Sequence, residues 1–179
     1  MGQRRKAREC ALLILFQREF RLEPLEQLCA QFWAEHPVPD EGRHYAEALV
    51  RGVAERGETI DAAIQGVAEH WAFERLALVD RNILRLAAYE LLFCEDIPPK
   101  VAINEAIELG KRFSTQNSGA FINGILDKIM NRAASGAPAS PASPVLPVSP
   151  VSIGEKTSTE DGAIALPSDD PGAQPAAES

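Results

Sequence analysis

The chain has 179 residues and carries 18 basic against 26 acidic residues, so its formal net charge is −8. This length suggests one domain with room for a tail, and an acidic average argues on first inspection against a nucleic-acid binder. The charge is uneven, however, because residues 133–179 contain six acids and one lysine, whereas the first eight residues contain four bases and no acid. The average therefore conceals a concentrated basic end.

Apolar residues recur at helical spacing through residues 1–132, and no segment alternates as a half-buried strand would. Asp40 and Asp80 are the expected N-caps of the third and fifth helices, and Thr59 is the expected start of the fourth. The expected helices cover roughly residues 3–20, 23–36, 40–56, 59–71, 80–95, 100–113 and 118–132. Short connections between amphipathic helices predict an all-α bundle.

The segment after Arg132 has a different composition. Eight of the 13 prolines lie there, and the segment has no aromatic residue and no helical or strand period. Such a chain cannot bury enough apolar surface to offset its conformational entropy. We therefore expect a folded body over 1–132 and a disordered, acidic Pro/Ala/Ser-rich tail over 133–179.

The first expected helix begins with four cations, Arg4, Arg5, Lys6 and Arg8. At 100° per residue, the three arginines share an arc of about 100°. Cations are unfavourable near the positive, N-terminal end of the helix dipole. Four of them in this one turn therefore suggest a functional demand. Phosphate binding would meet that demand, although a solvated leader explains the residues equally well. The apolar run 11–16 should be buried and hold this basic turn at the rim of a rigid body.

The seventh expected helix carries a polar strip of Asn123, Asp127 and Asn131, with Phe121 and Lys128 beside its apolar edge. The strip could bind a protein or stack a base. An exposed helix face with Phe121 in the core is the simpler interpretation.

Catalysis and metal binding find little support in the sequence. The chain has no nucleophile elbow, no glycine-rich phosphate loop, and no metal-ligand spacing among its three cysteines and three histidines. The basic start and short apolar run lack the cleavage site of a signal peptide, and the scattered cysteines suit a reducing compartment. We expect a cytoplasmic, non-enzymatic protein without a cofactor.

Four stretches together resemble the bacterial NusB family of transcription antitermination factors. The arginine-rich start and the centre of the fifth helix match that family, and the most specific match is the segment beginning Pro98-Pro99-Lys100. The matching stretches are residues 4–11, 83–91, 98–111 and 121–128. Their order and spacing follow the family across residues 3–132.

The resemblance implies an all-helical fold of two packed helical subdomains. It also implies binding to the boxA element of nascent ribosomal RNA transcripts as a heterodimer with NusE, a small-subunit ribosomal protein, so that RNA polymerase resists termination in ribosomal RNA operons. The RNA-binding residues implied are Arg4, Arg5, Lys6, Arg8, Phe16, Lys100 and Phe121. Asp80 and Asp127 are the implied partner-binding residues.

Two features depart from the family pattern, namely Pro99, where some members have an aromatic residue, and the tail after Arg132. The tail is too short for a fused catalytic domain, but its negative charge could compete with RNA for the basic turn. A helical adaptor that binds only protein, without sequence-specific RNA binding, is the alternative function.

Overall fold

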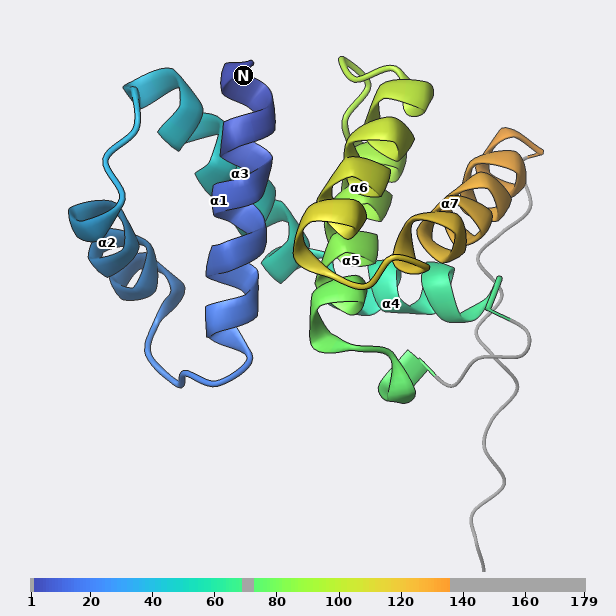
Figure 1. The fold of residues 1–179 in the computed structure, drawn as a ribbon, viewed down its shortest axis with the longest axis horizontal. Coiled ribbons are helices and arrows are strands. Elements are labelled where there is room, and N and C mark those ends of the chain that lie inside the picture. The colour runs from blue at the N-terminus through green and yellow to red at the C-terminus, as the bar shows by residue number, and fades with distance from the viewer. Residues whose placement is uncertain (1, 69–72, 136–179) are drawn as a thin grey trace, which may run out of the picture. The chain divides into compact units, whose positions relative to one another are not determined.

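The computed structural model describes residues 2–68 and 73–135, and all regular structure in these residues is helical (Figure 1). In chain order the elements are α1 (Gln3–Arg18), α2 (Leu25–Glu35), α3 (Asp40–Glu55), α4 (Gly57–Gln65), the 3-10 helix η1 (Phe73–Arg75), α5 (Leu78–Phe93), α6 (Pro99–Phe113) and α7 (Ser118–Ala134). The prediction of an all-α fold with about seven helices is confirmed.

Four predicted helix starts are wrong by one or two residues, because α2, α4, α5 and α6 begin at Leu25, Gly57, Leu78 and Pro99. Helix α3 begins at Asp40 as predicted, but Asp40 and Asp80 both lie inside their helices and not at the N-cap. Neither aspartate makes a side-chain cap hydrogen bond, because both already lie in the first helical turn. There the carboxylate interacts favourably with the positive end of the helix dipole instead. Helix α4 also ends earlier than predicted, at Gln65, and the predicted end at Trp71 lies outside the described residues.

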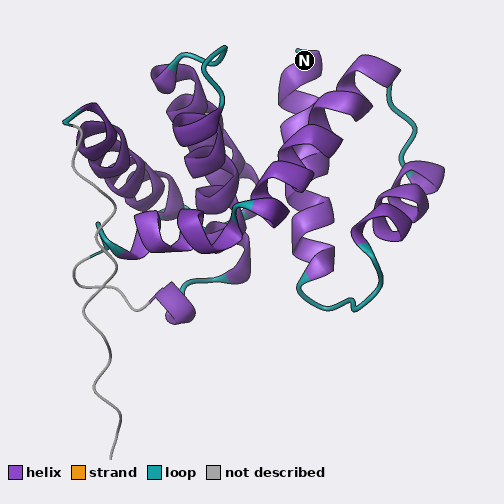
Figure 2. Ribbon diagram, turned by 180° about the vertical axis from the view of Figure 1, so that it is seen from behind, coloured by secondary structure: helices purple, strands orange, loops and turns teal. Residues whose placement is uncertain are grey.

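The helices form two groups, which Figure 1 and Figure 2 show from opposite sides. Helix α1 packs mainly on α3 and also contacts α2, whereas α5 packs against α4, α6 and α7. Helix α5 additionally contacts α1 and α3, so it joins the two groups through one continuous core. The prediction of two packed helical subdomains is therefore confirmed.

The apolar run of α1 anchors the basic turn in this core. Ala11, Leu12, Ile14 and Leu15 are buried, and Phe16 is half-buried. Burial of a large aliphatic side chain contributes about 1.5–3 kcal/mol, so this run fixes α1 firmly against its neighbours. The N-terminal turn of α1 is thus held by a rigid helix, as predicted.

The first two residues of the predicted tail, 133 and 134, belong to α7. Helix α7 continues to Ala134, and the prediction of disorder otherwise concerns residues 136–179, which lie outside the described part of the chain. In the part that is described, no helix has both the length and the apolar character needed to cross a membrane.

A close contact between α3 and α5 gives a test of the packing. A Cβ atom added at Gly52 would lie 2.0 Å from Cζ of Tyr89, so Gly52→Ala must displace the tyrosine ring. We expect this overpacking to cost about 1–3 kcal/mol of unfolding free energy, outweighing the gain of about 1 kcal/mol from alanine helix propensity. Gly42→Ala, in the same helix with no atom within 4 Å of the new Cβ, should stabilise the protein instead. Urea unfolding of both variants measures the two changes in unfolding free energy. Equal changes in the two variants would contradict the prediction.

Candidate nucleic-acid interface

The four cations of the first α1 turn differ sharply in exposure. The side chains of Arg4 and Lys6 are 60% and 54% exposed, and that of Arg5 is 41% exposed. The side chain of Arg8 is only 5% exposed. Three of these residues can therefore meet a ligand from solvent, and Arg8 lies beneath them.

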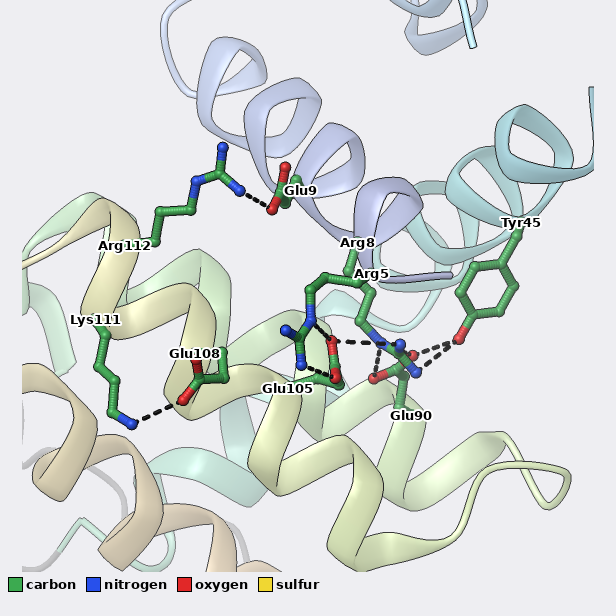
Figure 3. Close-up of polar contacts among 9 residues, drawn as sticks. All are labelled: Arg5, Arg8, Glu9, Tyr45, Glu90, Glu105, Glu108, Lys111 and Arg112. Carbon is green, nitrogen blue, oxygen red and sulfur yellow. Dashed lines mark hydrogen bonds and ion pairs between the residues drawn. The ribbon is translucent and has the colours of Figure 1, made fainter. Parts of the chain in front are cut away.

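Arg8 is held by a buried network that links three helices, as Figure 3 shows. Its Nε donates to both carboxylate oxygens of Glu90 on α5, at 2.9 and 3.1 Å, and its Nη2 donates to the Tyr45 hydroxyl of α3 at 3.2 Å. That hydroxyl in turn donates to Glu90 at 2.6 Å. Burial raises the pKa of Glu90 and, together with the Glu90 hydrogen bond, that of Tyr45. The guanidinium of Arg8 thus faces the protein interior rather than solvent.

Arg5 reaches across to α6. Its Nε and Nη2 donate to the two carboxylate oxygens of Glu105 at 2.9 and 2.6 Å, a bidentate pair (Figure 3). The hydrogen bond from Arg5 holds the pKa of Glu105 below its ordinary value, so the carboxylate stays ionised. The pair fixes the direction of the Arg5 side chain.

Glu9 and Arg112 form a second link between α1 and α6 that the sequence analysis missed. The carboxylate of Glu9 is buried, accepts a hydrogen bond from Arg112, and lies 3.5 Å from Nζ of Lys6. An acid and a base 103 positions apart leave no local sequence signal. Only the tertiary fold, in which side chains of α1 and α6 meet, brings them together.

The turn between α5 and α6 lies beside the basic turn. Nη1 of Arg4 is 3.7 Å from the Asp96 carboxylate, and the Arg4 guanidinium lies over the Tyr45 ring at 5.3 Å. Lys100 is exposed at the start of α6, four residues after Asp96. Of the remaining predicted RNA-binding residues, Lys100 is therefore the one that lies next in sequence to the turn that contacts Arg4.

Phe16 and Phe121 do not join this group. Phe16 is twelve positions after Arg4, which is about 18 Å along α1, and its ring contacts Phe20 at a centroid distance of 5.3 Å. Phe121 lies at the start of α7, beyond the end of α6 opposite Lys100, and it packs partly against the core. The 15-residue helix α6 spans about 22 Å between these ends.

The two predicted partner-binding acids occupy separate places. Asp80 is nearly buried, and its Oδ2 accepts a hydrogen bond from Ser118 at the start of α7 at 3.0 Å, while its Oδ1 has no partner among the described residues. Asp127 is half-buried on α7 and accepts a hydrogen bond from Asn123, one turn earlier, at 3.0 Å. The described residues contain no group of three or more His, Cys, Asp or Glu side chains that could hold a metal.

The sequence matches the model of the NusB family over residues 5–131. The chain belongs to the NusB family. The transcription antitermination protein NusB of Anaeromyxobacter sp. (strain Fw109-5) is 50% identical over 137 residues, covering 76% of this chain and 92% of that protein. NusB of Geobacter sulfurreducens is 49% identical over 132 residues, covering 72% of this chain and 94% of that one.

Solved structures agree with this NusB assignment. NusB of T. maritima is 46% identical, with a TM-score of 0.66 over 72% of this chain and 90% of that one. A crystal structure of antitermination factors NusB and NusE in complex with double-stranded RNA contains a chain 30% identical to this one. Its TM-score is 0.66, over 73% of this chain and 98% of that one.

The buried Arg8–Glu90 pair should matter strongly for stability. Glu90→Gln removes the negative charge but leaves the Arg8 cation buried, so we expect a loss of about 3–5 kcal/mol in the free energy of unfolding. The double variant Arg8→Met/Glu90→Met should recover most of the loss. Glu108→Gln, which disrupts an exposed pair with Lys111, is the matched control and should change little. Urea unfolding at neutral pH measures all three, and a native-like Glu90→Gln would contradict the prediction.

The Arg5–Glu105 pair predicts a pH dependence. Because the pKa of Glu105 is lowered in the folded protein, its contribution to stability is complete above the ordinary value of 4.5 and is lost as the pH falls below it. The stability difference between the native chain and Glu105→Gln should therefore shrink on acidification. Urea unfolding from neutral to acidic pH tests this, and a difference that stays constant through the acid range would be inconsistent with it.

Proposed function

We propose that this protein is an RNA-binding transcription antitermination factor. In this proposal it binds boxA of nascent ribosomal RNA transcripts as single-stranded RNA, together with NusE, and helps RNA polymerase to resist termination in ribosomal RNA operons. The protein acts by binding and not by catalysis, in the cytoplasm. Membership of the NusB family, the names of the relatives, and the similarity to a NusB seen with NusE and RNA all support this function.

The observation that carries the proposal is the group of exposed cations on the first turn of α1. Arg4, Arg5 and Lys6 present charge to solvent, and Lys100 extends it at the start of α6. RNA phosphates supply much of the affinity of such a surface, while unstacked bases supply the sequence preference. Since single strands contribute about 0.7 to the salt slope per contact, Arg4, Arg5 and Lys6 should contribute about 2.

The remaining residues have other roles in this proposal. Arg8 positions the basic turn through Glu90 and Tyr45 and does not itself contact phosphate. Phe16 and Phe121 would contact RNA bases or the partner outside the basic turn, since Phe16 lies about 18 Å from Arg4 along α1 and Phe121 lies beyond the end of α6 opposite Lys100. Asp80 and Asp127 belong to the surface proposed for NusE, where Asp80 also fixes the start of α7 through Ser118.

In this proposal NusE supplies positive charge that the chain itself lacks. Residues 1–132 carry a net charge of −3 despite their basic end, so the surface is a poor general binder of polyanions. A basic partner that adds its own cations would extend the site. RNA binding should therefore be local, sequence-selective and tightened by the partner.

The basic turn can be tested directly. Arg4→Gln/Lys6→Gln should weaken boxA binding and lower the salt slope by about 1.4, because it removes two phosphate contacts. Arg18→Gln/Arg51→Gln removes the same charge from the other end of α1 and from α3, and it should leave the slope unchanged. Mobility shifts at several salt concentrations provide the measurement.

Two further measurements distinguish the proposed function from that of a helical adaptor that binds only protein. A scrambled RNA should bind more weakly than boxA, whereas a helical adaptor without sequence-specific RNA binding would show no preference. Added NusE should tighten boxA binding cooperatively. Unchanged affinity in the Arg4→Gln/Lys6→Gln variant would remove the basic turn from the RNA site.

A further inference from the structure

The α1 and α6 helices enclose a second charged cleft beside the basic turn. Its volume is about 280 Å³, and both walls carry acidic and basic side chains. The charged residues that line it are Arg5, Glu9, Glu105, Glu108, Lys111 and Arg112. Each cation is paired with an acid, namely Arg5 with Glu105, Lys111 with Glu108, and Arg112 with Glu9 (Figure 3).

The cations lie nearer to solvent than two of their three acids. The side chains of Arg112 and Lys111 are 48% and 60% exposed, whereas that of Glu9 is 3% exposed and that of Glu105 is 16% exposed. An anion that approaches the cleft therefore meets guanidinium and ammonium groups first. The charges cancel in number, but their depth leaves a positive rim.

Arg5 keeps hydrogen-bonding capacity inside this cleft. Its bond to Glu105 uses one N–H of Nε and one of Nη2, which leaves three of the five guanidinium N–H groups for another acceptor. Glu105 also fixes the plane of the guanidinium, so a phosphate would meet donors that are already oriented. Arg112 enters from the opposite wall, where it donates a hydrogen bond to buried Glu9.

We propose that the α1–α6 cleft binds one backbone phosphate of the RNA, between Arg5 on one wall and Arg112 on the other, with Lys111 at the rim. This subsite extends the basic turn along α6 and adds two cations from the sixth helix to the RNA site. The inference rests on the proposed function, because it takes RNA as the source of the phosphate. Glu9 and Glu105 are positioning residues in it.

The test compares salt slopes for boxA RNA and for octauridylate, which has no boxA sequence. Arg112→Gln should lower the slope by about 0.7 with either RNA, because the one phosphate contact of the cleft is lost, and Lys111→Gln at the rim should lower it by less. Arg51→Gln, an exposed arginine of α3, removes the same charge elsewhere and should leave the slope unchanged. Because Arg112→Gln leaves Glu9 buried without its arginine, Glu9→Gln/Arg112→Gln serves as a second variant that removes both charges and should give the same slope.

A spectroscopic readout identifies the contact itself. On titration with octauridylate, the NMR signals of the Arg5 and Arg112 Nε–H groups should shift, while that of Arg51 should not. An unchanged slope in both Arg112 variants, or unshifted Arg5 and Arg112 signals, would overturn the cleft assignment. A failure of the proposed function is distinct, because it would appear as equal binding of boxA and scrambled RNA while octauridylate still reported on the cleft.

Discussion

The buried network of Arg8, Glu90 and Tyr45 is the interaction on which the rest of the structure depends. It joins α1, α5 and α3, and so ties the two helical groups together at the end that carries the basic turn. A paired buried charge tolerates little displacement, because loss of either partner leaves an uncompensated ion in a medium of low dielectric constant. The network also supplies the Tyr45 ring against which Arg4 lies. The buried Arg8–Glu90 pair therefore determines where the exposed cations of α1 lie.

The same principle explains how an acidic protein presents a basic surface. Glu90 of α5 and Glu105 of α6 face arginines of α1, and Glu9 of α1 faces Arg112 of α6. Glu105 and Glu9 lie deeper than the arginines with which they pair. The acids direct the arginine side chains and reduce their mutual repulsion, while Arg4, Lys6 and Lys111 keep most of their side chains in solvent. The position of charge, rather than its sum, determines what such a surface attracts.

The helices and their order were predictable from the sequence, because the apolar period and the turn residues are local signals. The common arc of Arg4, Arg5 and Arg8 was equally predictable, since helix geometry alone determines it. The depth to which each arginine is buried was not predictable, because Glu90 and Glu105 lie 82 and 100 positions after the arginines that they hold. Phe16 and Phe121 illustrate the same limit, since their membership of one patch depends on packing distances that no local pattern encodes.

The ion pairs between α1 and the later helices also have a consequence for the order of folding. Glu90 is 82 positions from Arg8, and Arg112 is 103 positions from Glu9. Helix α1 is synthesised first, yet its charged side finds its partners only after α5 and α6 have left the ribosome. Contacts of such long sequence separation slow folding relative to helical bundles built from neighbouring helices. Until they form, the arginines of the nascent chain remain solvated, and the surface that they later build together does not exist.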